Sequence, residues 1–448
     1  MMEKNLTTGS VLKTILLFAL PYLFSYFLQT LYGMADLFII GQYRGVDGIT
    51  AVSNGGQVMH MLTVIIVGLA MGATVTVGRA VGANRQEEAA LAIGNTVTLF
   101  MVVAVVVTAV LLVCVTPIVH LIGTPAEAVE GTRQYLTICF VGIPFITAYN
   151  IISSIFRGMG DSRSPMYFIG IACVANIALD YLFMGGFDMG PAGAALGTTL
   201  AQTLSVVIAL WAIRRRQTGI RLSGKDFRPQ RGILSRILKI GIPVAVQDGC
   251  IQIAFIVITV IANHRGLNDA AAVGIVEKVI GALFIVPSSM LATVSALAAQ
   301  NIGAGKHDRA AKTLRYAIFI TVAYGVVVNL LIQLTAESVI GFFTTDAAVI
   351  LLGSQYIRGY IWDAIFAGVH FCFSGYFCAY GRSYLGFLHN ILSITLVRIP
   401  GSYLTSARFP DTLLPMGMAA PAGSLLSVGI CLGAYLILKR RGVLQKET

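Results

Sequence analysis

The sequence predicts an all-α polytopic membrane protein with twelve transmembrane helices in two pseudo-symmetric six-helix bundles. Three observations lead to this prediction: the composition, the spacing of the apolar runs and an internal repeat. Hydrophobic residues make up 56% of the 448-residue chain and charged residues only 11%, whereas a soluble domain carries about 25% charged residues. Because so little polar side chain is present, we expect lipid rather than water to surround most of the protein.

Twelve apolar runs are long enough to cross a bilayer, for which about 20 residues suffice. The first six lie at about 14–41, 50–78, 90–115, 133–156, 165–184 and 192–213, and the second six at about 236–262, 271–298, 311–334, 354–380, 384–406 and 417–438. The first run has no small-residue cleavage site, so we expect it to stay as a helix. An even number of spans puts both termini on one side of the membrane.

Lys and Arg gather in alternate loops, above all in the connection between the two sets of spans. About 24 of the 31 Lys and Arg lie on the same side as the termini, and the positive-inside rule makes that side cytoplasmic. We therefore expect a bacterial or archaeal plasma (inner) membrane protein with both termini in the cytoplasm. The net charge of +11 follows from this topology, so we expect no nucleic-acid partner.

A long internal repeat relates the two halves of the chain at an offset of about 221 residues. Its matches are Leu20-Pro21 with Ile242-Pro243, Gly82-Ala83-Asn84-Arg85 with Gly303-Ala304-Gly305-Lys306, and Gly160-Asp161-Ser162 with Gly381-Arg382-Ser383. The repeat predicts an N-terminal lobe at 1–213, a basic cytoplasmic linker at 214–235 and a C-terminal lobe at 236–448. Two such bundles suit alternating access and favour a transporter, although receptors and intramembrane enzymes can also be duplicated bundles.

Two acids lie deep within the apolar runs of the first half. Because a charge near the bilayer centre costs at least about 2.5–3.5 kcal/mol, such an acid is a functional candidate. Asp36 shares a helix face with Tyr32 and Gln29, and Asp180 lies one helical turn after Asn176. The alternative is that both acids are surface residues near the ends of their helices.

Further polar side chains in the first half are expected to face the same interior pocket. Thr198 and Gln202 form a polar stripe in the sixth span, and Asn150 adds an amide to the fourth. Lipid is the only other surrounding available to these faces, and it is far more costly for polar groups. Thr198 alone would be weak support, since threonine in a membrane helix often bonds its own backbone.

The second half differs chemically from the first. The position that matches Asp36 is near Ile258, inside an apolar run. The buried acids of the second half that could take part in function are Asp248, Glu277 and Asp363, to which we assign a secondary role. Glu277 could also simply pair with its neighbour Lys278. The seven cysteines lack the paired spacing of a zinc site or of a disulfide framework, so we expect neither.

Several short motifs resemble those of the multidrug and toxic compound extrusion (MATE) family. They are Tyr32-Gly33-Met34-Ala35-Asp36 followed by Ile40-Gly41, the segment Gly82-Ala83-Asn84-Arg85, Phe156-Arg157-Gly158-Met159-Gly160-Asp161, and Gly193-Ala194-Ala195-Leu196-Gly197-Thr198. The resemblance covers the whole chain. It implies a twelve-helix antiporter that exports amphipathic, often cationic drugs or metabolites and is driven by a proton or sodium gradient.

The resemblance also implies roles for the polar residues. Asp36, Asn176, Asp180 and Thr198 look like the cation pocket of the N-terminal lobe in the prokaryotic DinF-like branch, in which Tyr32 and Asn150 are further polar members. Pro21 lies where the first helix of that branch bends. NorM-like relatives have acids in spans seven and ten, but Asp248 and Asp363 do not fall on those positions.

The expected mechanism follows from the acid pair. Two carboxyl groups close together in a low-dielectric cavity should not both ionise easily, so one proton or sodium ion would satisfy the pair. Its binding would rearrange the first helix around Pro21, which lacks a backbone hydrogen bond. We expect no cofactor, no metal other than sodium at this site, and a monomer.

Two rival functions have less support from the residues. A lipid-linked oligosaccharide flippase uses a related duplicated fold, but it has a cationic central cavity, whereas the interior charges of the first half are acids. An intramembrane enzyme is less favoured, since the sequence contains neither HExxH nor GxSxG.

Overall fold

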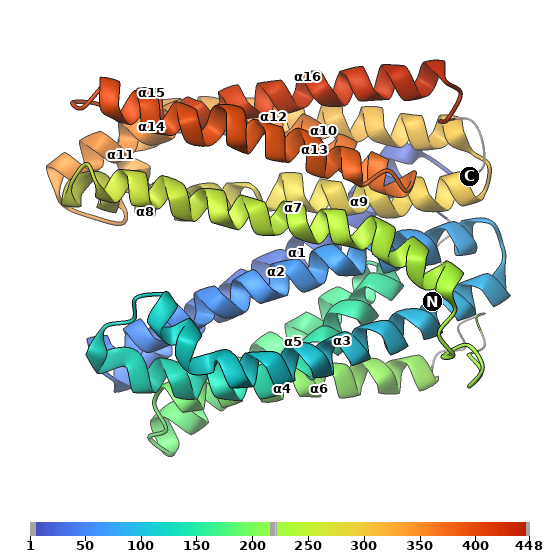
Figure 1. The fold of residues 1–448 in the computed structure, drawn as a ribbon, viewed down its shortest axis with the longest axis horizontal. Helices are drawn as coiled ribbons and strands as arrows, with labels where there is room; N and C mark the ends of the chain where they lie inside the picture. The colour runs from blue at the N-terminus through green and yellow to red at the C-terminus, as the bar shows by residue number, and fades with distance from the viewer. Residues whose placement is uncertain (1–5, 216–219, 221, 445–448) are drawn as a thin grey trace. The chain divides into compact units, whose positions relative to one another are not determined.

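The computed structural model describes residues 6–215, 220 and 222–444, and within them the chain is helical with no strand (Figure 1). The chain divides into two compact units. Unit 1 comprises Leu17–Gly241, and unit 2 comprises Leu6–Leu16 together with the chain from Ile242 onward. Leu6–Leu16 of the first half therefore group with the second half, and the start of α7 up to Gly241 groups with the first.

Unit 1 contains the first six spans. Its elements are α1 (Val11–Tyr43, from Leu17 on), α2 (Val46–Gly82), α3 (Gln86–Leu121), the short η1 (Ala126–Ala128), α4 (Val129–Gly158), α5 (Arg163–Asp180), the π-helix η2 (Tyr181–Gly186), α6 (Pro191–Arg215) and the start of α7 (Arg231–Asn263). Helix α4 packs against α2, α3 and α6, so it is the centre of this bundle.

Unit 2 contains the second six spans. After the rest of α7 come α8 (Leu267–Leu283), α9 (Ile285–Gly303), α10 (His307–Gly341), α11 (Ala347–Tyr360), α12 (Asp363–Ala379), α13 (Tyr384–Ser393), the π-helix η3 (Ile394–Arg398), α14 (Ile399–Arg408), α15 (Leu414–Gly417) and α16 (Ala419–Arg440). Helix α12 packs against α9, α10 and α16 and takes the central place.

The observed helices confirm the predicted fold class of a polytopic, all-α membrane protein. In the part of the chain that the structure describes, ten helices are long and apolar enough to span a bilayer, and the pair α11 and α12, bent by 42°, supplies an eleventh span. The remaining predicted span, 384–406, runs through α13, η3 and α14. It is divided into three pieces and carries the polar residues His389, Asn390 and Arg398.

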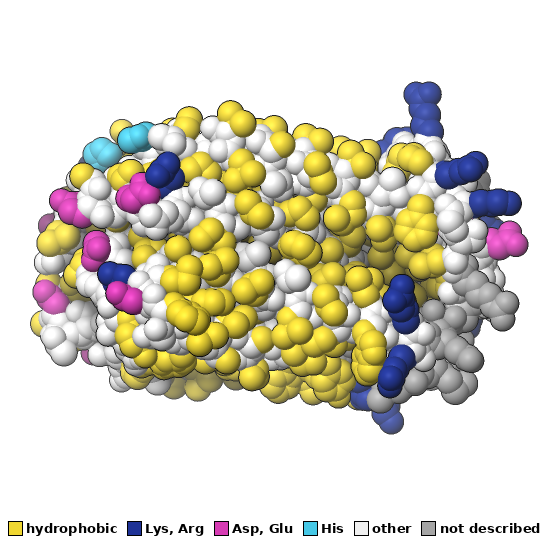
Figure 2. All heavy atoms as spheres, turned by 90° about the horizontal axis from the view of Figure 1, so that it is seen from below, with side chains coloured by type: hydrophobic (Ala, Val, Ile, Leu, Met, Phe, Trp, Pro, Cys, Tyr) yellow, Lys and Arg dark blue, Asp and Glu magenta, His cyan; other side chains and the backbone are white. Residues whose placement is uncertain are grey.

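The surface of the helices fits a lipid environment. Large apolar side chains such as Val113, Leu334 and Phe319 are 83%, 82% and 70% exposed, which would be unfavourable in water. On the face drawn in Figure 2, apolar side chains form a broad band, Lys and Arg gather at one end, and Asp and Glu lie mostly at the other. This separation is the pattern that the basic loops predicted.

The predicted linker at 214–235 lies partly outside the described residues, namely at 216–219 and 221. Its described part packs against α3. The Asn95 amide nitrogen donates to the carbonyl oxygen of Asp226 at 3.1 Å, and the Asn95 side-chain oxygen accepts from the backbone N–H of Gln230 at 2.6 Å. Asn95 is fully buried, so this connection is anchored to unit 1. The division into lobes at 213 and 236 stays a prediction.

The start of α7 crosses α2 at backbone contact distance within unit 1. A Cβ added to Gly241 would meet the backbone carbonyl oxygen of Leu69, and one added to Gly72 would meet that of Ile237. Small residues at membrane helix crossings allow this close approach. Because backbone atoms cannot move aside as a flexible side chain can, the two glycines fix the crossing.

We predict that Gly241→Ala lowers stability by about 1–3 kcal/mol, the typical cost of overpacking. The matched control is Gly249→Ala on the same helix, where a Cβ would meet nothing within 4 Å. That change should be neutral or stabilising by up to about 1 kcal/mol, since alanine favours helix. Thermal unfolding in detergent compares the two, and equal Tm values would contradict the close-crossing interpretation.

Candidate functional site

Four polar side chains from three helices of unit 1 meet in one cluster. The Thr198 hydroxyl on α6 donates to Asp36 Oδ2 on α1 at 3.2 Å. The Asn176 amide on α5 donates to Asp180 Oδ1 at 3.4 Å and lies 3.5 Å from the Thr198 hydroxyl oxygen. Asp36 is 4% exposed and Asp180 is fully buried, so neither is a surface acid. The structure thus brings together the four residues predicted from the sequence.

The local structure of α5 and α6 makes room for the Asp180 carboxyl group. Asp180 is the last residue of α5, and the π-helix η2 begins at Tyr181. Such π-segments often occur at functional sites. On α6, Gly197 faces Asp180 so closely that an added Cβ would meet the carboxyl oxygen Oδ1. The glycine before Thr198 is therefore required by the position of the acid.

The cluster has more oxygen acceptors than donors. Asp36 Oδ1, Asp180 Oδ2 and Asn176 Oδ1 are buried and accept no hydrogen bond from the described residues. The two carboxyl groups also interact directly with each other, and neither forms an ion pair with a described Lys, Arg or His. Two buried acids without a cationic partner leave room for one positive charge, and carboxylate and amide oxygens suit a proton or a hard cation.

The supporting residues divide into two groups. Tyr32 interacts with Asp36 and with Gln202, so Tyr32 and Gln202 belong to the cluster. Gln29 instead interacts with Tyr149, and the Asn150 amide donates to the carbonyl oxygen of Ile146 on its own helix at 2.8 Å. Gln29 and Asn150 therefore bond to groups outside the four-residue cluster.

Sequence reasoning missed two residues of α4 that border the cluster. Tyr135 and Cys139, both buried, interact electrostatically with Asp36 and with each other. Both lie within an apolar run, which does not show that they face the acids. The internal repeat, in which Tyr135 returns as Tyr356, could have drawn attention to the tyrosine, but no such signal exists for Cys139. Their place on α4 means that the central helix of unit 1 also lines the acid pair.

Pro21 lies inside α1, which the structure describes as one helix from Val11 to Tyr43. The Ser25 hydroxyl donates to the Pro21 carbonyl oxygen at 2.9 Å. Since proline has no N–H, this point of α1 lacks one backbone hydrogen bond. A bend of α1 at Pro21 stays a prediction.

In unit 2, a buried arginine that the sequence reasoning did not single out neutralises one of the predicted acids. Arg398, the last residue of η3, lies 3.8 Å from Asp363 Oδ2 on α12 and donates to the Tyr360 hydroxyl. Its guanidinium group also lies 5.4 Å from the ring centre of Phe255, in the range of a cation–π contact. The signal that could have found it is the presence of an arginine within the apolar run 384–406.

The other two candidate acids of unit 2, Glu277 and Asp248, have no ion-pair partner among the described residues. Glu277 Oε2 accepts from the Thr259 hydroxyl at 3.2 Å, while Oε1 has no donor among the described residues. Its electrostatic partner is Arg398, and no ion pair joins it to the exposed Lys278 in the described structure. Asp248 makes no hydrogen bond or ion pair with any described residue. The three C-lobe candidates therefore form no site like that of unit 1.

We predict that Arg398→Gln destabilises the protein by about 3–5 kcal/mol, because it leaves the carboxylate of Asp363 buried without a counter-charge. The double variant Arg398→Gln/Asp363→Asn removes both charges and should recover most of the loss. Thermal unfolding of the two variants in detergent tests this. If the double variant were as unstable as the single one, packing rather than charge pairing would explain the effect.

Comparison with known proteins agrees with this architecture. The curated relatives include the "Probable multidrug resistance protein YoeA" of Bacillus subtilis (strain 168), 25% identical over 433 residues that cover 95% of this chain and 94% of the relative. The "Probable multidrug resistance protein YpnP" of the same organism is 26% identical and covers 90% of each chain.

Among solved structures, the "Outward-facing conformation of a multidrug resistance MATE family transporter of the MOP superfamily" superposes with a TM-score of 0.90 over 100% of both chains at 22% identity, which shows a common fold. The family model MatE matches this chain twice, at residues 21–182 and 243–404. Both ends of the two matches are 222 residues apart, in agreement with the internal repeat. Since the matches cover both halves, this chain belongs to the MatE family, a family of membrane transporters.

Proposed function

We propose that this protein is an antiporter that exports amphipathic, often cationic drugs or metabolites across the plasma membrane, coupled to the entry of a proton or sodium ion. The observation that most supports this proposal is the buried pair Asp36 and Asp180, whose charges have no cationic partner among the described side chains. The names of the relatives, which describe multidrug resistance proteins, support the same class of substrate.

In this mechanism the acid pair alternates between an ion-bound and an ion-free state. With one positive charge bound, Asp36 and Asp180 share it, while Thr198 and Asn176 hold the carboxyl oxygens in place. Without it, the repulsion between the carboxylates favours a different arrangement of α1, for which the missing hydrogen bond at Pro21 provides a weak point. Coupling requires that the ion bind the two arrangements with different affinity.

The export direction follows from the order of these events. Ion binding from the outside would release an amphipathic cation from the outward-open protein, and ion release to the inside would restore the high-affinity state. In transporters built from two such bundles, rocking of the bundles exposes a binding site alternately to each side of the membrane, and we propose the same for this protein. We further propose that both termini lie in the cytoplasm and that the protein works as a monomer.

A flippase for lipid-linked oligosaccharides is not favoured. Its pyrophosphate load would require cations in the interior, whereas the unpaired charges in unit 1 are carboxylates. The buried Arg398 of unit 2 is already engaged by Asp363 and Tyr360.

We predict that Asp36→Asn and Asp180→Asn each reduce efflux of a fluorescent cation from energised vesicles at least about tenfold, because an amide has no negative charge with which to balance the coupling ion. Asp47→Asn, which changes an exposed acid at the start of α2, is the control and should transport normally. Imposing the pH and sodium gradients separately identifies the ion. Normal transport by both site variants would contradict the mechanism.

Gly197→Ala should impair coupled efflux although it removes no polar group. The added Cβ would meet Asp180 Oδ1 and push the carboxyl group away from Asn176, so we expect a loss of about tenfold in transport. Gly33→Ala, three residues before Asp36 on α1, meets nothing within 4 Å and should be harmless. Equal transport by the two alanine variants in the same vesicle assay would show that the position of Asp180 does not matter.

A further inference from the structure

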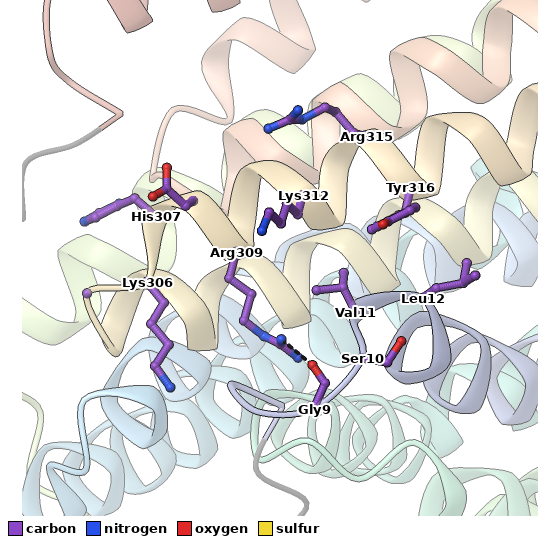
Figure 3. A pocket seen from close by; sticks show the side chains of 12 residues that line it. Gly9, Ser10, Val11, Leu12, Lys306, His307, Arg309, Lys312, Arg315 and Tyr316 are labelled. Carbon is purple, nitrogen blue, oxygen red and sulfur yellow. Dashed lines mark hydrogen bonds between the residues drawn. The ribbon is translucent and has the colours of Figure 1, made fainter.

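A cavity of about 1020 Å³ opens in unit 2 between the segment before α1 and the beginning of α10 (Figure 3). Four basic side chains line it, Lys306, Arg309, Lys312 and Arg315, against one acidic side chain, Asp308. The cavity is thus strongly cationic. It shares no residue with the acid cluster of unit 1 or with the Arg398 site, and the proposed export mechanism does not use it.

Two of the four basic residues build the wall of the cavity. The Arg309 guanidinium donates to the carbonyl oxygens of Gly9 and Thr8 at 2.7 Å each, and Lys306 Nζ donates to that of Thr7 at 2.9 Å. Figure 3 shows Arg309 reaching from α10 to Gly9. Carbonyl groups satisfy these donors without cancelling their charge, so both cations still contribute positive potential to the cavity.

The other two basic residues are available to a ligand. Lys312 and Arg315 lie three residues apart on α10, are exposed, and take part in no ion pair or hydrogen bond with the described residues. Residues at this spacing are neighbours on a helix surface. Together they present an ammonium and a guanidinium group, both of which bind phosphate well.

The cavity continues into an apolar surface on the same two helices. Leu12 on α1 and Tyr316 on α10 line it and are 39% and 43% exposed. One turn further along each helix, Leu16 and Phe319 are 49% and 70% exposed. A ligand that places an anionic group on the basic side chains would therefore have its remainder beside an exposed apolar tract.

We propose that this cavity binds an anionic phospholipid, with the phosphate paired to Lys312 and Arg315 and the acyl chains lying along Leu12 and Tyr316. Basic pockets at the ends of membrane helices favour anionic lipids, at about 1 kcal/mol per basic residue near the surface. The apolar continuation favours a lipid over free phosphate, which would gain nothing from it. Because Lys306 and Arg309 hold the segment at 7–9, a bound lipid would also brace the beginning of α1.

The test measures lipid binding to the purified full-length protein in detergent by native mass spectrometry, with phosphatidylglycerol compared with phosphatidylcholine. For Lys312→Ala/Arg315→Ala we expect about 30-fold weaker binding of phosphatidylglycerol, which corresponds to about 1 kcal/mol for each residue. Arg440→Ala/Arg441→Ala removes the same charge from exposed positions of unit 2 and should bind normally. Lys312→Arg/Arg315→Lys keeps the charge and should retain binding.

Several outcomes would overturn the proposal. Equal loss in the Arg440→Ala/Arg441→Ala control would mean a general charge effect, and unchanged binding in Lys312→Ala/Arg315→Ala would mean that the cavity is not the site. Competition by millimolar inorganic phosphate with the same affinity as the lipid would assign the cavity to a soluble phosphate. The thermal unfolding of each variant without lipid shows whether it is folded, and the charge-keeping variant decides the question if the alanine variant is not.

Discussion

A charge buried in a helix bundle that lipid surrounds must be compensated inside the protein, because neither water nor lipid can stabilise it there. The two units meet this constraint in different ways. Unit 2 supplies a counter-charge to two of its three candidate acids, since Arg398 lies beside Asp363 and acts electrostatically on Glu277. Unit 1 supplies only neutral partners to Asp36 and Asp180. In the mechanism proposed above, a bound proton or sodium ion supplies the missing positive charge.

The repeat does not carry the acid pair from one unit to the other. At the offset of 222 residues that separates the family matches, Asp36 falls on Ile258 and Asp180 on Ser402, neither of which is acidic. Asp363, which Arg398 neutralises in unit 2, has no acidic counterpart in the first half at that offset. The two halves therefore share a fold but not the chemistry of their interiors.

Much of this could be predicted from the sequence, because the membrane restricts the possible structures. The helix positions followed from apolar runs of sufficient length, and Asp36 and Asp180 were identified because an acid in such a run is costly. Arg398 was not predicted, since the apolar run 384–406 shows a span but not which acid on another helix would face its arginine. Helical spacing placed Gln29 on the face of Asp36, and Asn150 was included as a polar residue within a span. Neither observation can show whether a side chain bonds its neighbour, its own backbone or the site.

This difference in how the buried acids are paired also bears on the proposed antiport mechanism. In unit 2 the cation that pairs with Asp363 is part of the chain, namely Arg398, so this pair needs no ion from outside. In unit 1 the chain supplies no cation to Asp36 and Asp180. In the proposed mechanism, the stability of the acid pair therefore depends on the ion concentration on the side of the membrane to which the site is open. Because a ligand shifts an equilibrium only through its differential affinity for the two states, the proposed antiport would draw its energy from the ion that binds the acid pair of unit 1, and the fixed pair of Arg398 and Asp363 would contribute none.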